Sequence, residues 1–163
     1  MLIGVIASTQ KELPREALDA LRGVDWIVHC GRVGDPAVID RLSCLAPVTG
    51  VRTDADSPEA VPFPVVLFKK WAGAGVLILP ELGDPNDPFP AARREIEKSA
   101  PRVVIYGGEP KAGHVLIDGR LYVSPGCAVE ADGSIGTVAL IGLEGTVARA
   151  EIVPLAGDPD VDD

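Results

Sequence analysis

The sequence predicts an α/β protein built as a four-layer α/β/β/α sandwich, in which two mixed sheets lie face to face. The first part of the chain alternates short apolar runs with helix-like segments, as parallel strands joined by crossover helices do. The last third consists of short strand-like runs separated by turn dipeptides, which is typical of antiparallel hairpins. Helices that connect strands must cover outer faces, so two packed sheets with helices outside are expected.

The first part of the chain is organised around residues 2–6, an apolar run followed at once by small polar residues. This pattern is typical of a buried parallel strand that delivers a loop to the carboxyl edge of a sheet. A helix is expected over 13–23, because Pro14 suits its first turn and Gly23 its end. Ala17, Leu18 and Leu21 form its apolar stripe. The β-α-β-α-β pattern is completed by strands at 25–30 and 47–51 and a helix at 36–44, which presents Val38, Ile39 and Leu42 on one face.

The alternation of predicted strands and helices ends at residue 61. A hairpin is expected from strands 64–68 and 75–79 joined by residues 69–73, with Trp71 near its tip, followed by a turn-rich loop over 80–88. The remaining predicted elements are a helix at 91–99 and strands at 102–106, 114–117, 121–124, 137–143 and 147–155. We expect one domain over residues 1–156 and a flexible acidic tail over 157–163.

Composition excludes several function classes. The formal charge of −9 over 163 residues opposes binding to nucleic acid or to anionic lipid. Neither a signal peptide nor a membrane span is expected, because every apolar run is short. Cys30, Cys44 and Cys127 are widely spaced, which favours buried free thiols over a disulfide or zinc framework and predicts a cytoplasmic protein.

Candidate chemistry lies where the predicted strands end, because ligands bind at this edge of open α/β sheets. Five loops reach it: residues 7–11, 31–35, 53–56, 80–84 and 107–111. Among other candidates, Ser8 has no recognisable His-Asp relay, and no His lies near Cys127 in sequence to activate it.

The short sequence segments that flank these loops resemble the corresponding segments of the calcineurin-like metallophosphoesterases. The similarity covers residues 2–155, in stretches such as Ile3-Gly4-Val5-Ile6, Ile27-Val28-His29-Cys30-Gly31, Val103-Val104-Ile105-Tyr106-Gly107 and Ser124-Pro125-Gly126. It is greatest to the small single-domain phosphodiesterases, a branch that includes the scaffold subunit of the retromer coat. The resemblance implies the metallophosphoesterase-like sandwich and an activity that uses two divalent metal ions such as manganese.

The same resemblance identifies positions where the family's metal ligands are missing. The first motif, Asp-x-His, reads Ser8-Thr9-Gln10, and Gly-Asp reads Gly31-Arg32. Gly-Asn is replaced by Thr53-Asp54, and Gly-His-x-His by Gly107-Gly108-Glu109-Pro110; near Pro80 a His pair is missing. The vestigial positions are therefore Ser8, Gln10, Arg32, Asp54, Pro80, Gly108 and Pro110, with Asp54 as the one retained potential ligand. No catalytic residue, resident metal or other cofactor is expected.

Arg32 has two interpretations. It either stands in for the metals by pairing with loop acids such as Asp54, Asp56, Glu81 and Glu109, or binds an anion together with Lys11 or Lys111 and backbone N–H groups. His29 and His114 are expected to be structural rather than metal ligands.

These observations favour a non-catalytic binding or scaffold protein that has lost its dinuclear metal centre, with a protein partner, a second copy or a small anion as its ligand. The alternatives are a divergent metal-dependent phosphodiesterase and a phosphate or nucleotide sensor that uses Arg32.

Overall fold

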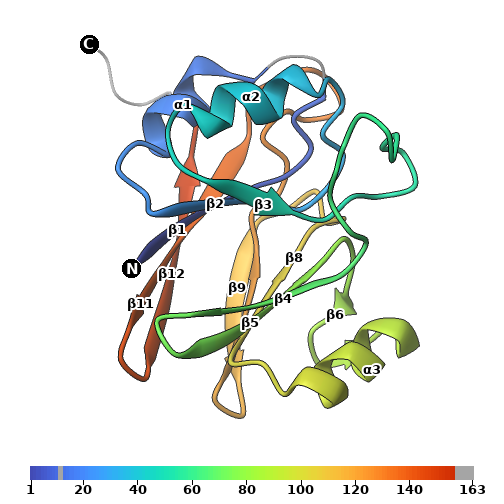
Figure 1. The fold of residues 1–163 in the computed structure, drawn as a ribbon, viewed down its shortest axis with the longest axis vertical. Helices are drawn as coiled ribbons and strands as arrows, with labels where there is room; N and C mark the ends of the chain where they lie inside the picture. Colours follow the sequence, from blue (N-terminus) through green and yellow to red (C-terminus); the bar gives the residue numbers. More distant parts are fainter. Residues whose placement is uncertain (11–12, 157–163) are drawn as a thin grey trace.

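The computed structural model describes residues 1–10 and 13–156, and these form the predicted four layers (Figure 1). The first sheet has the order β12-β11-β1-β2-β3. Its strands β1, β2 and β3 are parallel, whereas β11 and β12 are antiparallel. The bounds are β1 (Leu2–Ile6), β2 (Trp26–His29), β3 (Val48–Gly50), β11 (Thr137–Glu144) and β12 (Val147–Pro154).

The second sheet has the order β4-β5-β8-β10-β9. Strands β5, β8 and β10 are parallel, and β4 and β9 are antiparallel strands at the two edges. The bounds are β4 (Leu67–Trp71), β5 (Ala74–Leu79), β8 (Val103–Tyr106), β9 (Gly113–Ile117) and β10 (Arg120–Ser124).

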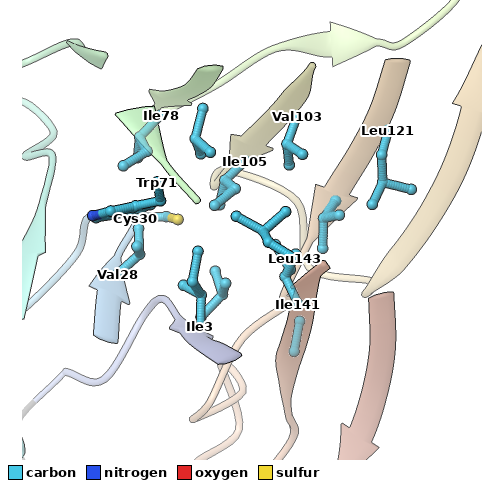
Figure 2. Packing of buried hydrophobic residues seen from close by; sticks show 14 of the residues in the cluster. Ile3, Val28, Cys30, Trp71, Ile78, Val103, Ile105, Leu121, Ile141 and Leu143 are labelled. Atoms are coloured by element: carbon cyan, nitrogen blue, oxygen red, sulfur yellow. The ribbon is translucent and has the colours of Figure 1, made fainter. Parts of the chain in front are cut away.

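Three hydrophobic clusters hold the four layers together. The cluster between the sheets includes Ile3, Val28, Ile78 and Ile105, all fully buried (Figure 2). A second cluster joins the first sheet to the helices α1 (Arg15–Ala20) and α2 (Ala37–Ser43), and a third joins the second sheet to α3 (Pro90–Ser99). The predicted helix stripes are confirmed, since Ala17, Leu21, Val38 and Leu42 are buried and Leu18 and Ile39 pack beside them.

The predicted hairpin exists, but its first strand was placed too early. Strand β4 pairs Trp71 with Ala74 across a two-residue turn, Ala72-Gly73, in which both φ angles are positive (50° and 80°). Such turns match the twist of the flanking strands, so the turn determined the register. Trp71 is therefore a buried strand residue that packs on Trp26, with ring centroids 5.4 Å apart.

Other predictions change at smaller scale. The loop over 80–88 contains a short ribbon, β6 (Gly83–Asp84) and β7 (Asp87–Pro88). Cys30 is buried as predicted, whereas Cys44 is exposed and Cys127 half-buried; all three thiols are free. The predicted tail at 157–163 lies outside the described residues. Among the helices of the described chain, none is long and apolar enough to cross a membrane.

Candidate functional site

The loops at the carboxyl ends of the strands enclose a cavity of about 520 Å³. Five of the seven vestigial positions line it: Ser8, Gln10, Arg32, Gly108 and Pro110. A neighbouring cavity of about 320 Å³ is lined by Asp54 and Pro80, and it shares Arg32 and Gly108 with the first. The structure therefore brings all seven predicted positions to one edge of the sandwich, with Arg32 and Gly108 between the two cavities.

Backbone hydrogen bonds join the loops that carry these positions. The N–H groups of Ser8 and Thr9 donate to the carbonyls of Gly31 and Arg32, at 3.0 and 3.1 Å. The N–H of Val129 in turn donates to the Ser8 carbonyl at 3.1 Å. The loops after β1, β2 and β10 thus form one continuous backbone layer beneath the larger cavity.

Close approach of the first two loops requires a glycine. At Gly34 (φ 77°) a Cβ atom would lie 1.8 Å from the carbonyl oxygen of Gln10. No side chain fits in that space, so the glycine permits the Asp35 N–H to donate to the same Gln10 oxygen at 3.0 Å.

Three vestigial positions have a backbone conformation that non-glycine residues rarely adopt. Ser8, Gln10 and Arg32 have φ angles of 55°, 53° and 55°. A left-handed conformation costs a residue with a side chain about 1 kcal/mol or more, and such residues concentrate at functional sites. The protein therefore maintains a strained backbone where the resemblance places metal ligands, although the side chains there differ.

Asp56 is the central polar residue of this edge. Its carboxylate is only 6% exposed and accepts hydrogen bonds from the backbone N–H groups of Arg32 (3.0 Å), Val33 (2.9 Å) and Thr53 (2.9 Å). It also accepts one from the Thr53 hydroxyl at 3.1 Å. One buried carboxylate thus ties the loop after β2 to the loop after β3.

His29 joins the loop after β1 to the same structure. The Thr9 hydroxyl donates to the Val33 carbonyl at 2.7 Å and lies 3.1 Å from His29 Nε2. Because that hydroxyl proton is already used, Nε2 carries a hydrogen and donates to Thr9 Oγ1. Nδ1 then accepts from the Gly31 N–H at 3.2 Å. Both ring nitrogens are satisfied in the neutral form of the imidazole.

Burial controls the ionisation of two groups beside the site. Desolvation lowers the pKa of His29 from 6.5 to about 4, although the nearby Asp56 carboxylate opposes the shift. A neutral His29 agrees with its hydrogen bonds, since a protonated Nδ1 could not accept from Gly31. Burial also raises the pKa of Cys30, so this thiol stays protonated.

The predicted ion pairs of Arg32 are absent from the described residues. Its side chain is exposed, and no carboxylate of residues 1–10 or 13–156 lies within 4.0 Å of the guanidinium. The loops are joined by Asp56 through main-chain N–H groups instead, which leaves the guanidinium directed at solvent and at the cavities. Lys111 is exposed and is not among the residues lining either cavity, and Lys11 lies outside the described residues.

The donors at this edge do not match the two-metal centre that the resemblance implies. Pro80, Gly108 and Pro110 have no side-chain donor, Ser8 and Gln10 offer neutral oxygens, and Arg32 is a cation. Asp54 is exposed and stands alone as a carboxylate among the seven positions. Across the part of the chain that the structure describes, no three His, Cys, Asp or Glu side chains form a group able to hold a metal.

The hydrogen-bonding roles of Thr9 and Asp56 at this edge were not predicted from the sequence. Thr9 stands at the variable position between Ser8 and Gln10, and nothing in the sequence marks it as a fully buried hydrogen-bonding residue. Asp56 was counted among the acids near Arg32, but its contacts are with the Arg32 backbone. The available signal was a Thr three residues before an Asp in a polar loop, a spacing typical of side-chain-to-backbone bonding. The segment containing Val129, Glu130 and Ala131 also lines the larger cavity without having been predicted.

Comparison with known proteins adds the following. A family model described as the calcineurin-like phosphoesterase superfamily domain matches residues 1–146. Over 61 residues the chain is 43% identical to a probable metallophosphoesterase of Methanocaldococcus jannaschii, a match that covers 34% of the chain and 32% of that protein. A probable metallophosphoesterase of Methanothermobacter thermautotrophicus is 36% identical over 69 residues, covering 39% of the chain and 40% of that protein. These matches thus span less than half of either curated relative.

Solved structures resemble the whole fold. Vps29 of Entamoeba histolytica complexed with Zn²⁺ superposes with a TM-score of 0.75 at 17% identity, over 96% of this chain and 100% of that one. An archaeal phosphodiesterase has a TM-score of 0.72 at 20% identity, over 94% and 100% of the two chains. At these identities the likeness shows the sandwich fold alone, and it confirms the predicted architecture.

Proposed function

The chain belongs to the calcineurin-like phosphoesterase superfamily, and we propose that within it this protein is a non-catalytic binding or scaffold protein without a dinuclear metal centre. The observation that carries the proposal is the side chain at residue 32. An arginine lines both cavities at the position where the family resemblance implies a carboxylate shared by two metal ions. It is the residue type least suited to that task.

Electrostatics support this proposal. At an effective dielectric constant of 20, two unit charges about 4 Å apart interact by about 4 kcal/mol, so a dication beside a guanidinium is opposed by about twice that. Arginine keeps its charge at any physiological pH, so it cannot relieve the repulsion by losing a proton. The exposed carboxylate of Asp54 is a single compensating charge in a screened position.

The Asp56 network supports a binding role for the same edge. In a site organised by metal ions, the ions hold the loops; here a carboxylate holds the Arg32 and Thr53 backbone. The loops are therefore ordered by the chain's own hydrogen bonds and can present a fixed surface to a partner. By analogy with the retromer scaffold subunit, the partner would be a protein. Free thiols at all three cysteines fit a cytoplasmic setting.

Metal analysis with a hydrolysis assay tests the proposal. The protein, purified and then equilibrated with Mn²⁺ or Zn²⁺, should retain far less than one metal ion per chain. It should hydrolyse a bis-aryl phosphate diester no faster than the metal-containing buffer does, because Asp54 alone cannot hold and activate a metal-bound water.

The Asp54→Asn variant is the control for this assay. If the protein has no metal centre, the variant and the original chain give the same background rate and metal content. Clear turnover that disappears in Asp54→Asn would overturn the proposal in favour of a divergent phosphodiesterase. Stoichiometric metal that survives the substitution would also overturn it, because the metal would then be held by other residues.

The exposed guanidinium of Arg32 favours a second candidate, an anion sensor. Within the described chain no carboxylate neutralises Arg32, and the glycine-rich turn at Gly108 lies beside it in both cavities. A guanidinium can bind a phosphate through two parallel hydrogen bonds, which a point charge such as lysine does not provide.

Isothermal titration calorimetry with inorganic phosphate and with a nucleotide distinguishes an anion sensor from a scaffold protein that binds no anion. An anion site predicts saturable binding that Arg32→Gln weakens by about tenfold or more, which is the loss of one charge-assisted contact of about 1.4 kcal/mol. Arg52→Gln is the matched control, because Arg52 lines the smaller cavity but donates to the Phe63 carbonyl. Absence of binding, or equal losses in both variants, would exclude the anion sensor.

A further inference from the structure

We propose that the outer edge of strand β9 is a self-association surface, through which two copies pair their β9 strands antiparallel to form one continuous sheet. This inference is independent of the metal question and of the proposed function, because no residue of β9 lines either cavity of the candidate site. It rests on how the four edge strands of the two sheets differ.

Edge strands expose unpaired N–H and C=O groups and are normally protected against pairing with another chain. Three of the four edges here have such protection. Strand β4 carries Lys69 and Lys70, β12 carries Arg149, Glu151 and Pro154, and β3 has only three residues. Charges, a proline and short length are the common devices against edge-to-edge association.

Strand β9 has none of these devices. Its sequence, Gly-His-Val-Leu-Ile, contains no lysine, carboxylate or proline, and it forms one margin of the second sheet. Val115 is 39% and Leu116 is 66% exposed, and Leu116 is the most exposed large apolar residue of the described chain. The register with β10 places Val115 opposite Tyr122 and Leu116 opposite Leu121, so the two side chains lie on opposite faces of the sheet. A partner strand would cover apolar surface on both faces.

Two copies of β9 that run antiparallel present side chains that fit each other. A two-fold axis at Val115, the middle residue, overlaps all five residues of β9 with those of the second copy. Val115 then faces Val115, Leu116 lies beside the flat ring of His114, and Gly113 leaves room for Ile117. Each opposite pair shares one face of the sheet, as antiparallel pairing requires.

Opposite charges flank the two ends of β9. Lys111 precedes the strand and Asp118 follows it, and both are exposed. In the register centred on Val115, Lys111 of each copy lies opposite Gly119 of the other copy, one residue from its Asp118, so a positive and a negative charge become neighbours at each end of the paired strands. This local attraction favours pairing of identical strands even though each copy has a net charge of −9. At physiological salt the distant charges are screened beyond about 8 Å, whereas the adjacent pairs are not.

Sedimentation analysis over a wide concentration range, at physiological salt, tests the proposal. The wild-type mass should rise with concentration from 17.0 kDa toward twice that value. Val115→Lys should remain monomeric, because it places two like charges directly opposite each other on the axis. The matched control is Val147→Lys, which adds the same charge at an exposed valine of β12 and should leave dimerisation unchanged.

A cysteine crosslink tests the register. In a Cys44→Ser background, Val115→Cys should form a disulfide-linked dimer on mild oxidation, because residues opposite each other across antiparallel strands are within disulfide reach. Leu116→Cys should crosslink much less, since its partner across the axis is His114. Independently of any variant, hydrogen exchange at the amides of residues 113–117 should slow as wild-type concentration rises.

A wild-type chain that stays monomeric at every concentration would overturn the proposal and leave an extended peptide of another protein as the occupant of this edge. A dimer that persists in Val115→Lys but is lost in Val147→Lys would place the interface on β12 instead. Crosslinking stronger at residue 116 than at 115 would overturn the register.

Discussion

Asp56→Asn should lower the free energy of unfolding by about 3 kcal/mol. The carboxylate accepts three backbone N–H bonds and one hydroxyl bond while almost completely buried. An amide has one acceptor oxygen, and its NH₂ group would face donors; each buried donor left unpaired costs about 1–3 kcal/mol. Urea unfolding at neutral pH measures the loss.

Asp54→Asn is the matched control, because the two acids are separated by one residue in the same loop. Asp54 is exposed, so the same change there should alter the unfolding free energy by no more than about 0.5 kcal/mol. Equal effects at the two positions would contradict the central role of Asp56. If Asp56→Asn is too unstable to purify, hydrogen exchange at the Arg32 and Val33 amides of the wild type provides the same information: both should be strongly protected.

The protein should lose about 3 kcal/mol of stability between pH 6.5 and pH 4 because of His29 alone. Burial lowers the pKa of the folded-state imidazole to about 4, against 6.5 when the chain is unfolded. In this window the unfolded chain binds a proton that the folded chain does not bind, so stability falls as the pH falls. The contribution is complete above pH 6.5, and each unit of pKa difference corresponds to about 1.4 kcal/mol.

Chemical denaturation of wild type and His29→Gln at several pH values isolates this contribution. The wild type should lose more stability on acidification than His29→Gln, whereas the exposed His114→Gln should follow the wild type. Nuclear magnetic resonance of the imidazole protons gives a direct value, with His114→Gln assigning the two rings. A His29 ring that titrates near pH 6.5 in the folded protein would contradict both its burial and its hydrogen-bond assignment.

Where sequence prediction succeeded, the signal was local and periodic. Strand β1 has the predicted bounds, because a short β-branched apolar run is typical of a strand that is buried on both faces of its sheet. Where prediction was wrong, a turn decided the outcome. Residues 64–68 have the apolar character of a strand, yet pairing with β5 starts at Leu67, because the two-residue turn at Ala72-Gly73 sets which residues face each other. Lys69, Lys70 and Trp71 then become strand residues.

The candidate site likewise has a part that the sequence predicts and a part that it does not. The seven vestigial positions were predicted from the resemblance to the family's sequence motifs. They lie together in the structure because parallel strands place the loops that follow them at one edge of the sheet. The contacts among them were not predictable. Ion pairs were expected at Arg32 because its charge is evident in the sequence, but Asp56 bonds to its main chain instead. The spacing of Thr53 and Asp56 signals only the bonds within their own loop, not those to the Arg32 and Val33 N–H groups.

The sequence by itself determined the layers, the parallel arrangement of the first three strands and which loops carry side chains to the ligand edge, because these follow from hydrophobic period and loop position. Only the tertiary structure decided which polar groups are buried and paired. Burial makes Asp56 the residue that joins two loops and keeps His29 neutral, whereas the Arg32 side chain stays exposed at the same edge. Such outcomes depend on distances between residues that are far apart in the chain.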